Sequence, residues 1–450
     1  MKKEEEIKKS KALDVSIKEG SAASVSSSFG DSYISAFATE IAHQTNPANA
    51  GLYVGSLSAV SSLVSPIAQL YGSNLMKKYP RKKIVLTFVL LQALIWIPLA
   101  ALAFSFYFDF YKNLTIYAVI ILYSLIAILG GLAYPAWFSW MGDIVPENQR
   151  GKYFSKRNLI TGIVGLVAII IGALMIRWFE KLALTIIGFG LFFVLAAIFR
   201  LISFKTFKKQ YLPKFYFHKK DYISLSQFLK NQDNYKKFAI YQAVFNFTIM
   251  IASPFFLVYM KQDLNFSYST IMIISVSSSI FYLLFSKFAG KVSDKYGNVK
   301  LMYISNLCFV ASPLFWIILK NPISLIFIPQ LVVGLGNAAF VISTTNFTYD
   351  AVPQQKRGEY VAYTNILIGI GAFIGSILGG LLLKYLSIMS FNKFIILFLI
   401  AAVARFLAFL IFLPSIKEVK RVSQFHPMHI KLGHPFKTLH HEIGHFTFSR

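Results

Sequence analysis

The chain has 450 residues, of which 56% are hydrophobic, 16% aromatic and only 14% charged, and its net charge is +26. This composition is too apolar for a soluble domain and indicates a polytopic membrane protein. A nucleic-acid reader would gather its basic residues on one folded face, whereas here they are spread over many short connections. No nucleic-acid partner is therefore expected.

Residues 1–20 mix Lys with Glu and lack the apolar core and cleavage site of a signal peptide, so we expect a short cytosolic N-terminal extension. Twelve apolar runs follow, each about as long as a helix needs to cross roughly 30 Å of hydrocarbon. The runs are continuously apolar rather than alternating, which favours helices over barrel strands. They lie at about 21–43, 51–72, 84–106, 115–141, 158–178, 183–203, 238–261, 268–289, 300–319, 323–347, 359–383 and 393–414.

The first run carries a polar stripe, because Ser, Asp and Thr recur every three or four residues along one helix face. A polar face on a membrane-crossing helix is expected to meet water or substrate, and an intramembrane carboxylate is a functional-site candidate by default. The candidates for substrate or proton binding here are Asp31, Ser28, Ser35 and Glu40. The alternatives are that Asp31 only bonds to serines or to a basic partner, and that Glu40 is an interfacial residue.

One motif occurs twice. The segment Asp143-Ile-Val-Pro-Glu-Asn-Gln-Arg150-Gly recurs as Asp350-Ala-Val-Pro-Gln-Gln-Lys-Arg357-Gly, 207 residues later (350 − 143). An offset near half the chain length, with apolar helices on both sides, indicates two duplicated membrane halves. Each copy predicts a turn that starts the next helix, and its charges are candidates for a salt-bridge gate between the halves. The alternative is a plain turn with topology-setting charge.

Two charges inside apolar runs also repeat, Arg200 and Arg405, at an offset of 205 residues (405 − 200). A charged side chain at the bilayer centre costs about 2.5–3.5 kcal/mol, and less near the interface. We expect these arginines either to reach the interface or to pair with acids from the loops between the fourth and fifth helices, and we count them among the gating candidates.

A long basic connection, 204–237, separates the two groups of six runs, 21–203 and 238–414. If both termini are cytoplasmic, this loop, the tail 415–450 and most of the 45 Lys and Arg residues fall on the same side of the membrane. The positive-inside rule then predicts cytoplasmic N- and C-termini. The central loop is expected at the inner membrane surface.

The segment Gly290-Lys-Val-Ser-Asp294-Lys-Tyr-Gly297, after the eighth run, and the Arg-Gly loops described above resemble the major facilitator superfamily over roughly residues 20–415. The resemblance implies two six-helix bundles that rock about a central cavity, and it makes Asp294 a gate-type carboxylate. Gly290 and Gly297 are both expected at backbone turns. In the family, helices 1, 4, 7 and 10 line the cavity, which adds Tyr134, Trp137, Gln242, Asn246, Asn337 and Asn346 as cavity candidates.

The tail is rich in histidine and contains His441-Glu442-Ile443-Gly444-His445, preceded by His440. His-Glu-x-x-His on a helix can place two imidazoles on one face for zinc. Only five residues follow and no pocket-forming domain surrounds the motif, so no metal site is predicted. His441 and His445 remain a weak alternative as ligands.

The sequence thus predicts an all-α polytopic membrane protein of twelve transmembrane helices, arranged as two six-helix bundles related by internal duplication. We expect a secondary active transporter in the cell membrane, monomeric and surrounded by lipid, that moves a small solute by alternating access. A proton is the candidate coupling ion, and neither a cofactor nor enzymatic activity is expected. The alternative is a non-transporting sensor or scaffold that uses a metal-binding tail.

Overall fold

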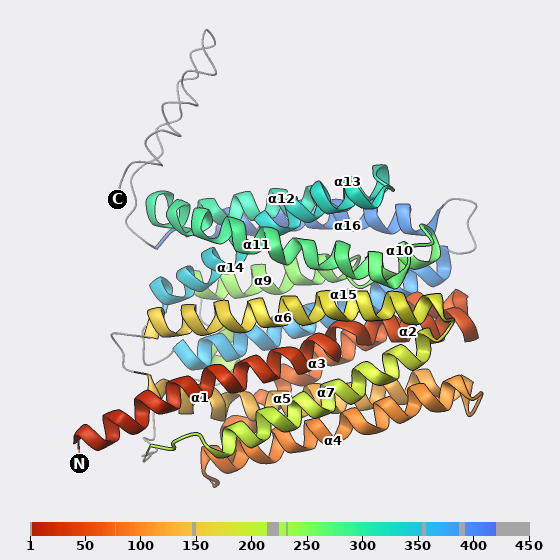
Figure 1. Cartoon of the computed structure of the whole chain (residues 1–450). Coiled ribbons are helices and arrows are strands. Elements are labelled where there is room, and N and C mark those ends of the chain that lie inside the picture. The colour runs from red at the N-terminus through yellow and green to blue at the C-terminus, as the bar shows by residue number, and fades with distance from the viewer. Residues whose placement is uncertain are drawn as a thin grey trace.

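The computed structural model describes residues 2–76, 78–145, 150–213, 225–230, 233–352, 357–386 and 392–419. The long helices run roughly side by side (Figure 1). The first half consists of α1 (Lys2–Phe29), α2 (Asp31–Thr45), the 3-10 helix η1 (Pro47–Asn49), α3 (Ala50–Leu75), α4 (Arg81–Tyr107), α5 (Lys112–Ile144), α6 (Arg150–Lys181) and α7 (Thr185–Lys208). The short α8 (Leu225–Lys230) lies in the central connection.

The second half consists of α9 (Asn234–Met250), α10 (Phe255–Gln262), α11 (Tyr268–Tyr296), α12 (Asn298–Ile318), α13 (Pro322–Phe327), α14 (Pro329–Ala351), α15 (Arg357–Leu386), α16 (Lys393–Phe412) and the 3-10 helix η3 (Leu413–Ser415). Within the described residues, eleven segments are long and apolar enough to cross a bilayer. Residues 2–45, whose mean hydropathy is lowered by the predicted polar stripe, are not among the eleven. The helical fold class is confirmed.

Three of the predicted runs are each built from two helices. The first breaks at Gly30, where the ring of Trp96 occupies the space that a Cβ atom would need. The seventh breaks just before α10 at Pro254, which has no backbone N–H to continue the helix ladder, and the tenth breaks before Pro329 for the same reason. The Gly30 break matters most, because it makes Asp31 the first residue of a new helix.

The predicted N-terminal extension is helical and continuous with the first membrane helix. Tyr153 on α6 donates a hydrogen bond from its hydroxyl to the carbonyl of Leu13, at 3.0 Å. Ala12 and Ser16 are buried. Residues 13–20 therefore pack against α6 as part of the first half.

Of the two glycines expected at turns, one prediction is confirmed and one is wrong. Gly297, between α11 and α12, has φ +94°, a conformation that favours glycine. Gly290 lies inside α11, and a Cβ atom placed there would meet nothing within 4 Å. Spacing in the sequence could not separate a helix interior from a turn at that position.

The bundle has two distinguishable ends. The N-terminus and residues 209–213 and 416–419 lie at one end, called here the terminus end, and the connections 46–49, 108–111, 182–184 and 263–267 lie at the other, the far end (Figure 1). Among the described residues, the largest buried apolar cluster contains residues of both halves, including Phe37, Phe189, Phe255, Tyr268 and Phe398. The clusters nearer the terminus end each belong to a single half. The halves thus share a core toward the far end.

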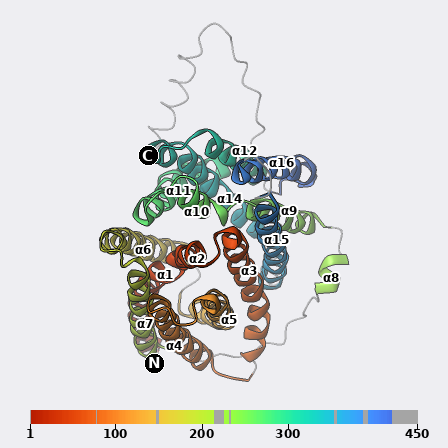
Figure 2. The ribbon, with the colours of Figure 1, turned by 90° about the vertical axis from the view of Figure 1, so that its right-hand side faces the viewer.

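Two seams join the halves, α3 against α15 on one flank and α6 against α11 on the other (Figure 2). The α3–α15 seam is tight because it uses glycine: a Cβ atom added at Gly55 would lie 2.8 Å from the carbonyl oxygen of Ser376. A second glycine face of α15, at Gly371, Gly375 and Gly379, packs against backbone carbonyls of α9. The small-residue face of α15 therefore serves close helix packing.

Candidate functional site

A cavity of about 360 Å³ lies inside the first half, between α1, α2, α4, α5, α6 and α7. Its walls include a polar set that an apolar bundle would not need for packing alone. This set consists of Ser24, Ser27, Asp31, Gln92, Arg157 and Arg200. The cavity therefore brings one acid and two bases, from the three helices α2, α6 and α7, to one space.

Asp31 is the carboxylate of this cavity. It is the first residue of α2, and its carboxylate accepts a hydrogen bond from the Ser27 hydroxyl at 2.6 Å. The helix start favours negative charge there. Asp31 and Ser27 are both exposed, whereas the residues after Asp31 on α2, from Tyr33 onward, are largely buried. The carboxylate thus faces the cavity, where water, a proton or a solute can reach it.

Arg200 supplies positive charge to the same cavity. Its Nε donates to the Gln92 side-chain oxygen at 3.1 Å, and its Nη2 also donates to that oxygen. Gln92 is in turn oriented by its own amide, which donates to the carbonyl of Ile126 at 2.9 Å. The arginine predicted to be costly inside an apolar helix is therefore held by α4 and lines a cavity wall.

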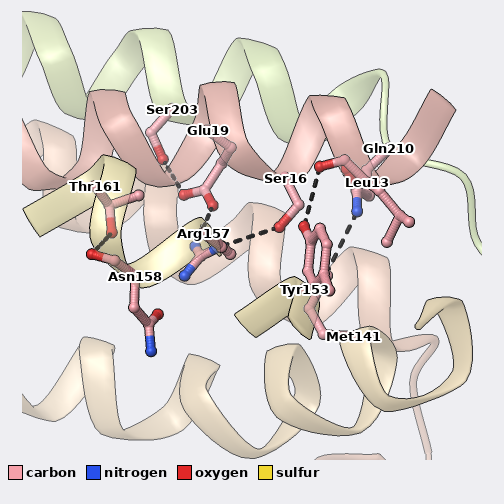
Figure 3. A network of polar contacts seen from close by, with 10 residues as sticks. All are labelled: Leu13, Ser16, Glu19, Met141, Tyr153, Arg157, Asn158, Thr161, Ser203 and Gln210. Carbon is pink, nitrogen blue, oxygen red and sulfur yellow. Dashed lines mark hydrogen bonds and ion pairs between the residues drawn. The ribbon is translucent and has the colours of Figure 1, made fainter. Parts of the chain in front are cut away.

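A second charged pair lies toward the terminus end. Arg157 Nη2 is 3.5 Å from Glu19 Oε2, and Arg157 Nε donates to Ser16 at 3.2 Å (Figure 3). Ser203 donates to Glu19 Oε1 at 2.8 Å, and the guanidinium stacks 5.0 Å from the ring centre of Trp137. Glu19 is only 3% exposed. Such a buried carboxylate needs these partners, because an unpaired buried charge is strongly destabilising.

Among the described residues, no acid pairs with Arg405, the second-half counterpart of Arg200. Arg405 is 2% exposed and donates from Nη1 to the carbonyl of Phe309 at 2.8 Å and from Nη2 to that of Ile249 at 3.1 Å. Its Nε is buried without a hydrogen-bond partner among the described residues. The two halves have therefore diverged, since Arg200 lines a cavity and Arg405 clamps α9 and α12 to α16.

Two of the acids among the gating candidates, Asp143 and Asp350, have partners within their own halves. Arg81 Nη1 lies 2.7 Å from Asp143 Oδ2, and Asn298 donates to Asp350 Oδ2 at 2.9 Å. Asp294 is exposed near the end of α11. Arg150 and Arg357 begin α6 and α15, and their side chains lie outside the described part of the chain.

The remaining substrate candidates are dispersed. Ser28 is buried and donates to the carbonyl of Gly165 at 2.9 Å, and Glu40 lies at the far end, where Tyr268 donates to it. Ser35 lies beyond Asp31 on α2, Tyr134 is exposed on α5, and Asn337 is half-buried on α14. Asn246 donates to the carbonyl of Gln242, and Asn346 to the hydroxyl of Ser293. Of the substrate candidates, Asp31 is the one that lines the cavity.

Sequence reasoning missed Glu19, Gln92 and Arg157 as site residues. Glu19 and Arg157 lie just outside the predicted apolar runs, where charges are expected at a membrane surface. Helical spacing places Ser16, Glu19, Ala23, Ser27 and Asp31 on one face, but this spacing alone does not distinguish Glu19 from an ordinary charge beside an apolar run, and it says nothing of Gln92 or Arg157. No group of three or more His, Cys, Asp or Glu residues suited to a metal occurs in the described ranges, and His441 and His445 lie outside them.

Comparison with known proteins adds the family. A sequence profile described as Major Facilitator Superfamily matches residues 20–233 and 238–443, and so covers both halves. The chain belongs to the Major Facilitator Superfamily. It is therefore a multi-pass membrane transporter of that type, as the two internal repeats predicted.

Curated relatives match only part of the chain. A multi-drug resistance efflux pump PmrA homolog of Lactococcus lactis is 24% identical over 258 residues, 54% of this chain and 59% of the relative. The vacuolar basic amino acid transporter 2 of Saccharomyces cerevisiae is 31% identical over 96 residues, 21% of this chain and 20% of the relative. The chain thus spans about a fifth of the yeast relative it matches.

Solved structures match nearly the whole chain. An auto-inhibited POT family peptide transporter superposes with a TM-score of 0.68 at 12% identity, covering 93% of this chain and 99% of that one. The nucleoside transporter NupG superposes with a TM-score of 0.63 at 16% identity, covering 90% of this chain and 99% of that one. At this level of sequence identity, structural similarity shows a shared fold and nothing more.

Proposed function

We propose that this superfamily member is a secondary active transporter that works by alternating access, and that Asp31 is the residue at which a small polar solute and a proton are exchanged. The observation that carries the proposal is an exposed carboxylate in a cavity enclosed by apolar helices. An intramembrane acid is costly, so its retention next to open space favours a role in binding.

The arrangement of the two cores supports alternating access. The halves share an apolar core near the far end and have separate cores toward the terminus end. This is the arrangement expected of a transporter that is closed at one side of the membrane and open at the other. With the termini on the cytoplasmic side, as the basic residues predict, this conformation is inward-facing.

Charge balance supports exchange at Asp31. Arg157 pairs with Glu19, and Arg200 interacts electrostatically first with Glu19 and then with Asp31, with which it shares the cavity. A solute cation that approaches Asp31 competes with a proton for the same carboxylate, and either occupant leaves the cavity with the same total charge. Such competition is sufficient to couple the two movements.

The relatives do not agree on a solute, since their names mention basic amino acids, peptides, nucleosides and drugs. The test therefore uses purified protein in liposomes loaded with a pH-sensitive dye and a panel of lysine, a dipeptide, adenosine and tetraphenylphosphonium. We expect at least one of these solutes to trigger a proton flux in the wild-type protein. Asp31→Asn is expected to lose the proton flux, and Asp31→Glu is expected to keep part of it.

Ser27→Ala is the matched control, because it removes the hydroxyl that donates to Asp31 and leaves the carboxylate. We expect it to keep part of the flux, because it loses one hydrogen bond to the carboxylate while the carboxylate itself remains. Solute uptake without proton movement in wild type would overturn the coupling. A proton flux that survives in Asp31→Asn would overturn the role of Asp31, and a panel without any uptake would overturn transport of these solute classes.

A further inference from the structure

At the far end, Tyr268 of the second half packs into the first half. It is the first residue of α11 and is completely buried. Its hydroxyl donates to Glu40 Oε2 on α2 at 2.8 Å, and its ring meets the ring of Phe189 on α7 edge-on, with centres 5.3 Å apart. One side chain of the second half thus contacts two helices of the first.

The backbone of the same residue reaches a third helix. The N–H of Tyr268 donates to Glu180 Oε1 on α6 at 2.6 Å. The first N–H groups of a helix have no acceptor within that helix, and a carboxylate near a helix start is electrostatically favoured. Glu180 therefore caps α11 from the other half of the protein, so that the cap is lost if the halves separate here.

The surroundings make this contact specific. Lys261 of α10 lies 4.3 Å from the ring centre of Tyr268, on the side of the second half. The other Glu40 oxygen, Oε1, accepts from Gln44 at 2.8 Å, so both oxygens of this nearly buried carboxylate are satisfied while Tyr268 is in place. Withdrawing Tyr268 would leave Glu40 short of a donor until water replaced it.

The opposite seam is different in kind. There α3 and α15 meet mainly through small residues, as at Gly55 and Ser376, and the Leu383 side chain of α15 packs over Gly51 of α3. A tight seam of small residues can slide or pivot with little loss of contact. Tyr268 is different, because its hydroxyl and its backbone N–H each donate one directed hydrogen bond, and both are lost when the residue is withdrawn. The two flanks are therefore suited to different roles in a rocking motion.

We propose that Tyr268, held by Glu40 and Glu180, is the latch that keeps the far end closed, and that its withdrawal is required for the outward-facing state. The proposal rests on the alternating-access part of the proposed function and is independent of the role of Asp31. It predicts that weakening the latch raises the outward-facing population without altering the solute cavity.

The test measures distances between spin labels in full-length protein with Cys308→Ser. One pair of labels, at Asn113→Cys and Lys320→Cys, spans the halves at the far end, where both residues are exposed. A second pair, at Tyr79→Cys and Lys291→Cys, spans the terminus end. Wild type is expected to show mainly the short far-end distance.

Three variants weaken the latch to different degrees. Tyr268→Ala removes ring and hydroxyl, Tyr268→Phe removes only the hydroxyl, and Glu40→Gln replaces a charged acceptor by a neutral one. We expect the long far-end distance to gain population in the order Tyr268→Ala, Tyr268→Phe, Glu40→Gln, and Tyr268→Phe to raise the outward-to-inward ratio by about tenfold. The terminus-end distance should shorten in the same molecules.

Tyr259→Phe is the matched control. Tyr259 is also buried at the far end, but its ring contacts, Trp316, Phe394 and Phe398, all belong to its own half. It should leave both distance distributions unchanged. If Tyr268→Phe behaves like Tyr259→Phe while Tyr268→Ala also stays closed, the latch is overturned. Asp31→Asn should not move the far-end distance, so failure of the latch and failure of the exchange site are distinguishable.

Discussion

Arg81 and Asp143 form an ion pair, with Nη1 and Oδ2 2.7 Å apart, that ties the start of α4 to the end of α5 at the terminus end. In the second half, the hydrogen bond from Asn298 to Asp350 ties the start of α12 to the end of α14, the corresponding helices. The internal repeat has therefore preserved a polar tie at the same place in each half, with a charged donor in one and a neutral donor in the other.

The two ties are expected to differ in how much they stabilise the protein. The Arg81 side chain is 1% exposed and that of Asp143 42% exposed, so the pair is partly screened. We expect Asp143→Asn to lower the free energy of unfolding by about 1–2 kcal/mol, and Asp350→Asn by about 0.5–1.5 kcal/mol, because the second loses only a neutral donor's hydrogen bond. Thermal unfolding in detergent measures both, and equal effects would contradict the comparison.

The second prediction concerns glycine packing. At Gly375 an added methyl group would collide with the carbonyl of Phe247 on α9, whereas at Gly290 it would meet nothing within 4 Å. Gly375→Ala should therefore destabilise the protein by about 1–3 kcal/mol, and Gly290→Ala should stabilise it by about 0.5–1 kcal/mol, since alanine is the better helix former. A neutral Gly375→Ala variant in the same unfolding assay would show that α9 and α15 can move apart freely.

The third prediction tests the buried pair of α1 and α6. Glu19→Gln should cost about 2–4 kcal/mol, because it leaves Arg157 without its ion partner in a poorly solvated place. The double variant Glu19→Gln/Arg157→Gln should be more stable than the sum of the two single changes predicts, by at least about 1 kcal/mol. Additive effects in this double-mutant cycle would mean that the two residues act independently, despite their 3.5 Å separation.

Much of this fold can be predicted from the sequence, because continuous apolar runs of bilayer length and a repeated motif leave few other architectures. Asp31 could be found for the same reason, as a polar group in an apolar run. Glu19 and Arg157 could not, since charges beside a run are ordinary, and their pairing depends on how α1 and α6 pack. Tyr268 carries no signal in the sequence, because aromatic residues at helix ends are common in membrane proteins.

Whether a solute reaches Asp31 can be measured directly. The protein in native-like membranes is treated with a hydrophobic carbodiimide, which modifies protonated carboxyl groups, and modified residues are found by mass spectrometry. We expect modification at Asp31 that a transported solute prevents, and little modification at Asp143, which is paired with Arg81. Modification of Asp31 that no transported solute prevents, or an Asp31 that never reacts, would contradict the assignment of the cavity as the transport site.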